Sequence, residues 1–467
     1  MSDEFEAVVE TVRDRIDPDP DERDRLATVV DRLTERVQDA VAELPVEADV
    51  IQVGSTARGT WLAGDRDIDL FVRFSPDLDR EDLETYGLEI GRDVLPDGRE
   101  EYAEHPYTVG EFEGFEVDLV PCFGVEDATA IKSAVDRTPF HTRYLRERLD
   151  EATATEVRVC KQFCKGIGVY GSDLRTRGFS GYLLELLVLE HGGFRPLVEA
   201  AADWHPPVTF DPEDHGRRET ASPSRNDEGG STALGFDDPL VVIDPTDPER
   251  NVAAVLASEN VSRLQHYARE LLADPRSDLF FPEERTPLDA ADVRAAIDDR
   301  GTTPVTVVFE TPDLVEDDLY PQLQKSRSGL VGELDRRGFD VLRSTVFADD
   351  DRAAVLADLE VAERPAVERH EGPPIHVRDH AENFFEAYAD TDATGPFVDG
   401  DRYVVERDRE YTSAVDLLES DAVFEVSLGV HVEQALEDDY DLLSGSDVAS
   451  LAERFGTELA AFFDPAP

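Results

Sequence analysis

The first hydrophobic positions of the chain recur with the period of a helix. Between residues 1 and 48, apolar side chains fall three or four positions apart, with acids and arginines between them: Val29, Val30, Leu33, Val37, Val41 and Leu44. This spacing is typical of helices that bury one face, and we expect them to cover a sheet. The polar stretch 77–97 predicts another helix, and 102–109 and 110–120 predict paired strands that turn at Glu113-Gly114.

Alternation replaces this period at residues 49–53, where Asp-Val-Ile-Gln-Val predicts a strand. Gly54 and Ser55 then interrupt the strand. Glycine lets the backbone approach a ligand closely, and the N–H groups that open the following short helix favour an anion. After a second glycine turn, residues 67–72 predict another strand, on which residues i and i+2 share a face. Asp67 and Asp69 therefore share one face, and the apolar residues of the opposite face turn to the core: Ile68, Leu70 and Val72.

Helical patterns dominate the next part of the chain. Thr138-Pro139 marks a helix start, because proline is favoured in the first turn. Residues 156–170 carry an apolar stripe, and Gly178-Phe179-Ser180 caps a strongly apolar helix that we expect in the core. A short strand is predicted at 237–245, and the start of another helix at 248–254, with Arg250 in its first turn.

An acidic insertion at residues 211–235 is rich in Asp, Ser, Arg, Gly and Glu and has no periodicity, which predicts an exposed, disordered segment. Beyond residue 285 the pattern changes again. Residues 304–309 predict a strand, 319–337 a helix and 339–346 a strand, whereas 354–361 predict short mixed elements. This order predicts a small α+β unit of ferredoxin-like type, and helices at 448–463 close the chain. We expect three domains: 1–135, 136–284 and 285–467.

Charge sets limits on the partners of this protein. The net charge is −60, because 106 Asp and Glu residues outnumber 46 Lys and Arg residues. The lysines are few and can be named in full: Lys132, Lys161, Lys165 and Lys325. An acid-rich, lysine-poor surface predicts adaptation to a salt-rich cytoplasm. Acidity normally argues against nucleic-acid binding, but molar salt screens charges beyond roughly 3 Å, so shape and hydrogen bonds can carry recognition instead.

Cysteine usage and hydropathy indicate a cytoplasmic protein. Three cysteines exclude a disulfide scaffold, and Cys160 and Cys164, one helical turn apart, are expected to pack inside a helix bundle. The N-terminus is acidic and has no pattern of a signal peptide. The longest apolar stretch, 182–189, is interrupted by Glu185 and is too short to span a bilayer, so we expect no membrane partner.

The candidate chemistry lies in the stretch around residues 54–69. Carboxylates on one face of a strand, beside a turn that can receive phosphate, suit Mg²⁺ and a nucleoside triphosphate. An acid-x-acid triplet alone is weak evidence, because acids fill 106 of 467 positions. The glycine-serine turn and the apolar strand behind Asp67 and Asp69 make the combination specific. Asp118 lies in the apolar run Val117-Asp118-Leu119-Val120, where an unpaired charge is costly, and completes a candidate two-metal site.

Three further residues are candidates for contact with a nucleotide. His141 falls in the first turn of its helix, although a lone histidine is more often an ordinary polar residue. Lys161 is retained in a chain that otherwise uses arginine, and a compact ammonium suits a phosphate contact. Tyr170 follows in Gly166-Ile167-Gly168-Val169-Tyr170-Gly171 and can stack on a nucleotide or donate a hydrogen bond to it.

Together, Gly54-Ser55, Asp67-x-Asp69 and Asp118 resemble the polymerase β-like nucleotidyltransferase superfamily. Further segments are similar to the archaeal class I CCA-adding enzymes (CCA tRNA nucleotidyltransferases): 54–62, 137–141, 161–171, 178–182 and 250–254. The resemblance covers about residues 30–280 through these motifs and the C-terminal part more loosely. It implies a multidomain α+β protein with a nucleotidyltransferase head, a helical neck, an α+β body with the ferredoxin-like unit, and a tail.

The resemblance implies that the protein adds C, C and A to the 3′ end of tRNA from CTP and ATP, without a nucleic-acid template and with release of pyrophosphate. Asp67, Asp69 and Asp118 would hold Mg²⁺, and Asp118 would also orient or deprotonate the attacking hydroxyl. The family's nucleotide contacts would fall on Gly54, Ser55, Arg58, Thr138, His141, Lys161, Tyr170 and, for the base, Arg250. A homodimer is also implied. This chain departs from the family in having Asp67 where glutamate is frequent and in its longer acidic insertion.

Two other functions fit some of the same residues. A poly(A) polymerase or an oligoadenylate synthase-like enzyme would use the same three aspartates but form a different product. An RNA-binding protein with a retired transferase domain would be expected to lack at least one of these carboxylates, and all three are present.

Overall fold

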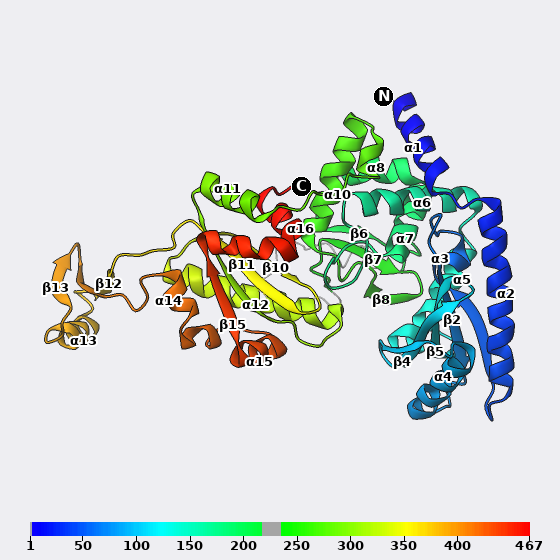
Figure 1. Cartoon of the computed structure of the whole chain (residues 1–467), viewed down its shortest axis with the longest axis horizontal. Coiled ribbons are helices and arrows are strands. Elements are labelled where there is room, and N and C mark those ends of the chain that lie inside the picture. Colours follow the sequence, from blue (N-terminus) through cyan, green and yellow to red (C-terminus); the bar gives the residue numbers. More distant parts are fainter. Residues whose placement is uncertain (1, 217–234) are drawn as a thin grey trace. The chain divides into compact units, whose positions relative to one another are not determined.

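The computed structural model describes residues 2–216 and 235–467, which form two compact units, Met1–Glu283 and Glu284–Pro467 (Figure 1). Most of the predicted insertion at 211–235 lies outside the described residues. No helix of the described residues is long and apolar enough to cross a membrane. The mixed α+β architecture predicted from the sequence is confirmed, whereas its division into three domains stays a prediction.

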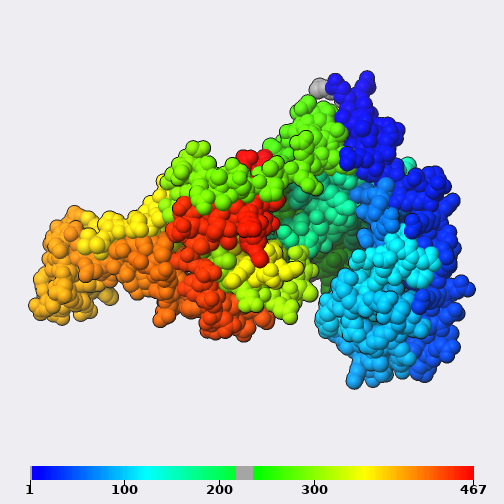
Figure 2. All heavy atoms as spheres, viewed as in Figure 1, coloured from blue at the N-terminus to red at the C-terminus, as the bar shows by residue number. Residues whose placement is uncertain are grey.

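The first unit begins with a five-stranded sheet in the order β1-β2-β5-β4-β3. These strands are Ala48–Val53, Asp67–Phe74, Phe115–Phe123, Pro106–Phe112 and Arg99–Tyr102. The central pair, β2 and β5, is parallel, and the other pairs are antiparallel. In Figure 2 these strands and their covering helices, dark blue to cyan, pack into one continuous body.

Two helices, α2 (Pro20–Ala42) and α4 (Arg80–Val94), share one hydrophobic core with one face of this sheet. The apolar stripe of α2 buries Leu26, Val29, Leu33 and Val37, and Asp19 caps the helix by accepting a hydrogen bond from the Glu22 N–H group. The predicted helices of residues 1–48 and 77–97 are therefore confirmed. The turn at Glu113-Gly114 is also confirmed, but β4 begins at Pro106, because residues 103–105 turn the chain from β3 into β4.

Helices form most of the rest of the first unit and enclose a second core. They are α1 (Ser2–Ile16), α5 (Thr138–Arg146), α6 (Glu151–Gly166), α7 (Gly181–His191), α8 (Phe194–Ala202) and α10 (Ser258–Ala273). Cys160 and Cys164 are free thiols buried in this core, as predicted. Helix α6 ends at Gly166, four residues before the predicted end, because Gly168 adopts a left-handed φ of 72°.

A small sheet, β6-β7-β8, lies in the same unit and is made of Val208–Phe210, Leu240–Asp244 and Asp247–Asn251. The predicted helix at 248–254 is wrong: Arg250 lies on β8, which forms a hairpin with β7. The hairpin holds because the Asn251 side chain accepts from the backbone N–H of Val242 and donates to the carbonyl of Leu240. The local sequence at 248–254 is compatible with a helix start, but pairing with β7 stabilises residues 247–251 as a strand instead.

The second unit contains a ferredoxin-like sheet in the order β10-β11-β9-β15. Its strands are β9 (Thr303–Glu310), β10 (Val341–Ala348), β11 (Arg352–Leu359) and β15 (Tyr440–Ser444), with α12 (Glu316–Arg337) and α15 (Val430–Asp438) before β10 and β15. The ferredoxin-like prediction is confirmed. The expectation of short mixed elements at 354–361 is wrong, because 352–359 form a central, buried strand.

A second, three-stranded sheet, β12-β14-β13, lies between β11 and α14 in the chain and carries one helix. It comprises β12 (Val367–Pro374), α13 (Arg378–Tyr388), β13 (Thr394–Asp399) and β14 (Arg402–Asp408). The remaining helices of this unit are α11 (Ala290–Arg300), α14 (Ala414–Leu418) and α16 (Ala452–Phe463). Short 3₁₀ helices link elements at Ala128–Ala130, Ala134–Arg137, Ser277–Leu279, Asp421–Phe424 and Gly445–Leu451.

We predict that Leu70→Ala destabilises the first unit by about 2–5 kcal/mol, because it empties a fully buried position of β2. Both tryptophans of the chain, Trp61 and Trp204, lie in this unit, so their fluorescence during urea unfolding reports on it alone. Glu81→Ala, at an exposed position of α4, is the control and should shift the free energy of unfolding by less than about 0.5 kcal/mol. Equal shifts in the free energy of unfolding for Leu70→Ala and Glu81→Ala would contradict the burial of Leu70.

Candidate active site

Two of the predicted carboxylates are neighbours across the parallel pair at the centre of the sheet. Asp69 on β2 is the register partner of Asp118 on β5, and on its other side it pairs with Val53, the last residue of β1. Ile68 and Leu70 point to the opposite face and are buried. Asp67 therefore lies on the face of Asp69, as predicted, at the exposed start of the strand.

The turn after β1 approaches Asp69 closely. Gly54 has a left-handed φ of +73°, and a Cβ atom added to it would lie 1.7 Å from Oδ2 of Asp69. Position 54 therefore requires glycine for two reasons. Other residues rarely adopt this backbone conformation, and Asp69 leaves no room for a side chain. Ser55 and Arg58 follow in the short helix α3 (Gly54–Arg58), which Gly59 caps in the left-handed conformation.

The carboxylates repel one another in the absence of a cation. Burial and the neighbouring Asp69 raise the pKa of Asp118 to about 7. Burial also raises the pKa of Asp69, and Asp67 adds to this effect, while Arg58 and Lys161 oppose it. The pKa of Asp67 is raised by burial and by Asp65 and Glu116. Such a cluster favours binding of a proton or a metal ion.

These residues suit a metal that takes part of its coordination from a substrate. Among the described residues, no three or more His, Cys, Asp or Glu side chains form a group that could hold a metal ion by themselves. Mg²⁺ is usually held by one or two carboxylates together with substrate phosphates and waters. The mutual repulsion of Asp69 and Asp118 fits such an incomplete, cation-seeking site.

Two predicted cationic residues, Arg58 and Lys161, lie close enough to Asp69 to lower its pKa. Arg58 forms an ion pair with Glu185 of α7, at 3.0 Å between Nη2 and Oε2, and it also contacts Thr142. Lys161 of α6 is buried, and its Nζ donates a hydrogen bond of 2.9 Å to the carbonyl of Thr60. Burial lowers the pKa of Lys161 to about 8.

Tyr170 and Lys161 meet at the start of α7. A Cβ atom on Gly181, the first residue of this helix, would lie 3.3 Å from the Tyr170 hydroxyl and 3.6 Å from Lys161 Nζ. The helix is capped by Ser180, whose side chain accepts from the Leu183 N–H group, as the sequence predicted. The structure thus brings these two candidate residues together, although they lie on different elements.

His141 and Arg250 converge on a residue that sequence reasoning left without a role, Asp244 of β7. The Asp244 carboxylate contacts His141 Nε2 at 2.8 Å and accepts a hydrogen bond of 2.9 Å from Arg250 Nη1. Tyr182 stacks on the His141 ring, with 4.0 Å between centroids, and donates its hydroxyl to the same carboxylate. Burial by itself raises the pKa of Asp244, but its hydrogen bonds from His141 and Thr246 outweigh burial and hold the pKa below its usual range. Burial lowers the pKa of His141.

The structure therefore groups the predicted residues in two sets. One set surrounds Asp69: Gly54, Arg58, Asp67, Asp118 and Lys161. The other surrounds Asp244, and it is close enough to the first for Arg58 to influence His141 electrostatically. Thr138 begins α5, three positions before His141. Glu185 and Asp244 were missed as partners, although each is a lone acid in an apolar segment, a pattern that signals a buried charge with a partner.

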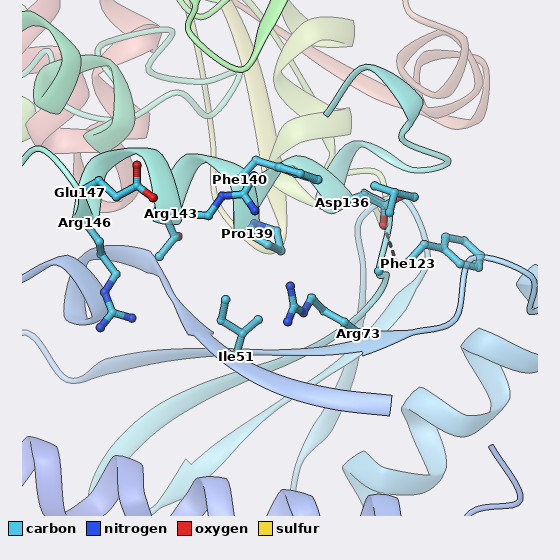
Figure 3. Close-up of a pocket in the computed structure, with 12 residues that line it drawn as sticks. Ile51, Arg73, Phe123, Asp136, Pro139, Phe140, Arg143, Arg146 and Glu147 are labelled. Atoms are coloured by element: carbon cyan, nitrogen blue, oxygen red, sulfur yellow. Dashed lines mark hydrogen bonds between the residues drawn. The ribbon is translucent and has the colours of Figure 1, made fainter. Parts of the chain in front are cut away.

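A cavity of about 420 Å³ lies on the same face of the sheet, farther along β2. Figure 3 shows Ile51 and Arg73 on the strands and Pro139, Phe140 and Arg143 on α5 on either side of it. None of the predicted site residues lines this cavity, and Thr142 of its wall accepts a hydrogen bond from Arg58.

The sheet, the turn and the carboxylate pair define the class of this protein as a nucleotidyltransferase. Residues 32–141 match the family described as nucleotidyltransferase domain, and 155–281 match the second domain of tRNA nucleotidyltransferase. Residues 300–445 match the C-terminal domain of the CCA-adding enzyme.

Relatives over the whole length identify the family. The chain is 61% identical to a CCA-adding enzyme of Haloarcula marismortui and 59% identical to one of Halorubrum lacusprofundi, each covering 100% of both chains. A CCA-adding enzyme of Methanoregula boonei is 42% identical over 96% of this chain and 93% of its own. The chain belongs to the CCA-adding enzyme family. The prediction of a halophilic protein is supported by the first two relatives.

We predict that Asp118→Asn raises the melting temperature of the metal-free protein at pH 8. The raised pKa means that the folded state binds a proton more tightly than the unfolded state, so this carboxylate costs stability as the pH rises from about 4 through about 7. The difference in melting temperature between the variant and the wild type should be smaller at pH 5. At pH 8, Mg²⁺ should also reduce this difference, because it stabilises only the wild type.

Thermal unfolding in chelator-treated buffer measures both effects. Glu111→Gln removes an exposed acid from β4 and should change the melting temperature little at either pH. A lower melting temperature for Asp118→Asn at pH 8 would contradict the predicted repulsion.

Proposed function

We propose that this protein adds C, C and A to the 3′ end of tRNA from CTP and ATP, without a nucleic-acid template. The observation that carries the proposal is the register pair Asp69–Asp118 beside the Gly54–Arg58 turn. Membership of the CCA-adding enzyme family supports the acceptor and the product. In this proposal the protein acts in the cytoplasm, as its composition predicts, and forms the homodimer that the family resemblance implies.

Asp67, Asp69 and Asp118 would hold the divalent metal, which we propose to be Mg²⁺. When bound, the metal supplies positive charge that neutralises the phosphates and the developing charge of the transition state. Asp118 would also orient or deprotonate the attacking 3′-hydroxyl with its carboxylate, which lies beside Asp69 in the register of the parallel pair.

The remaining residues position the nucleotide, which is most of what nucleotidyl transfer requires from a protein. In this proposal Arg58 and Lys161 contact the triphosphate as cations. Gly54 lets the backbone approach the triphosphate. The other residues that contact the nucleotide are Ser55, Thr138, His141 and Tyr170. Arg250 reads the base together with the RNA backbone, and Asp244 holds both Arg250 and His141 in place.

The test is incorporation into tRNA that lacks its last three nucleotides, in high KCl with Mg²⁺. We expect two additions from CTP alone and one further A when ATP is also present. Long A tails from ATP alone would overturn the proposal in favour of a poly(A) polymerase. No incorporation at any salt concentration would overturn catalysis itself.

We predict that Gly54→Ala lowers activity by at least about 100-fold, because its methyl group must displace the Asp69 carboxylate. Gly59→Ala is a matched control. Gly59 has nearly the same backbone conformation, with φ of +70°, but no atom lies within 4 Å of an added Cβ. The two variants carry similar backbone strain, so an equal loss of CTP incorporation would show that the collision with Asp69 is unimportant.

A further inference from the structure

Glu185 is a fully buried acid within the apolar run 182–189 of helix α7. Helix α7 has the sequence GYLLELLVLEH, and Glu185 is 0% exposed, as little as Val188 of the same helix. A buried carboxylate is costly unless it is paired and hydrogen-bonded. Its partners therefore decide what it does.

The Arg58 guanidinium is one partner, and Glu185 holds it along one edge. Arg58 Nε donates a hydrogen bond of 3.1 Å to Oε1, and Nη2 lies 3.0 Å from Oε2. Nη1 donates a longer bond of 3.4 Å to Thr142. A guanidinium has five N–H donors. Two of them are left without a partner among the described residues, and the two-point contact fixes the plane in which they lie.

Thr60 connects the same carboxylate to Lys161. The Thr60 hydroxyl donates to Oε1 of Glu185, and the Thr60 carbonyl accepts the hydrogen bond from Lys161 Nζ. Thr60, Lys161 and Glu185 are all buried. The side-chain positions of Arg58 and Lys161, the two cations near Asp69, thus depend on one acid, Glu185 of α7.

We propose that Glu185 is a positioning residue for nucleotide binding, which holds the free N–H groups of Arg58 toward the triphosphate and keeps Lys161 in place through Thr60. This inference rests on the proposed function. Stability alone does not require the glutamate, because replacing a buried ion pair by packed apolar residues is often neutral or stabilising. A leucine would continue the apolar sequence of α7, but it would leave Arg58 without its two-point contact.

The first test compares steady-state CTP incorporation by the full-length wild type and by Glu185→Gln. The substitution keeps the size of the side chain and removes its charge. We expect the KM for CTP to rise about 10- to 100-fold, as for loss of a hydrogen bond to a charged group, with a smaller effect on kcat. Glu190→Gln on the exposed end of the same helix is the control and should leave both constants unchanged.

A double-mutant cycle separates positioning from a general structural role. Because Glu185 acts through Arg58 and also through Thr60 on Lys161, Glu185→Gln should raise the KM by a clearly smaller factor in an Arg58→Ala background than in the wild type. Multiplication of the two effects would overturn the inference. Glu185→Asp keeps the charge but withdraws the carboxylate by one methylene, so the KM should stay raised. Full recovery with aspartate would show that charge alone matters and would also overturn it.

The outcomes distinguish this inference from the proposed function. Failure of the wild type to extend tRNA would overturn the function. A wild type that extends tRNA, with Glu185→Gln of unchanged KM, would overturn only the role of Glu185. Thermal unfolding of each variant shows whether it is folded at the assay temperature. If Glu185→Gln is unfolded, Thr60→Val, which removes only the hydroxyl that donates to Glu185, should still raise the KM; an unchanged KM would then overturn the inference.

Discussion

The parallel register between β2 and β5 is the constraint on which the candidate site depends. It sets Asp69 level with Asp118, and it is fixed by the alternation of apolar residues on both strands, Ile68 and Leu70 on one and Val117 and Leu119 on the other. A shift of one residue in either strand would turn its carboxylate into the hydrophobic core and its apolar residues toward the ligand. The helices α2 and α4 bury that apolar face, so the core of the sheet enforces the geometry of the opposite face.

Two cations of the site, Arg58 and Arg250, are held by acids on other elements of the same unit, helix α7 and strand β7. Glu185 pairs with Arg58, and Asp244 pairs with Arg250 and contacts His141. Both acids are fully buried, in contrast to the many exposed acids that give the chain its charge of −60. In molar salt, exposed charges are strongly screened, whereas buried pairs keep most of their interaction. Buried acids therefore give a halophilic protein a means of fixing its cationic residues that salt does not weaken.

Local sequence was sufficient wherever one short segment contains both the pattern and its consequence. The strand at 67–72, the turn at Gly54, the capped helix after Ser180 and the stripe of α2 follow from period, glycine and capping rules, and the structure contains them. Prediction failed at 248–254 and 354–361. These segments overlap the strands β8 and β11, whose hydrogen bonds come from residues across a hairpin or distant in the sequence, and local propensity contains no information on such partners.

The sequence by itself determined that Asp67 and Asp69 share a face, that Asp118 lies in an apolar strand, and that the motifs belong to one family. Those facts depend on spacing within a few residues or on direct resemblance. Only the tertiary structure decided that Asp69 stands level with Asp118, that Glu185 holds Arg58 over a separation of 127 residues, and that Asp244 gathers His141 and Arg250. The physical reason is that a buried charge requires a partner, and the folding of distant segments selects that partner.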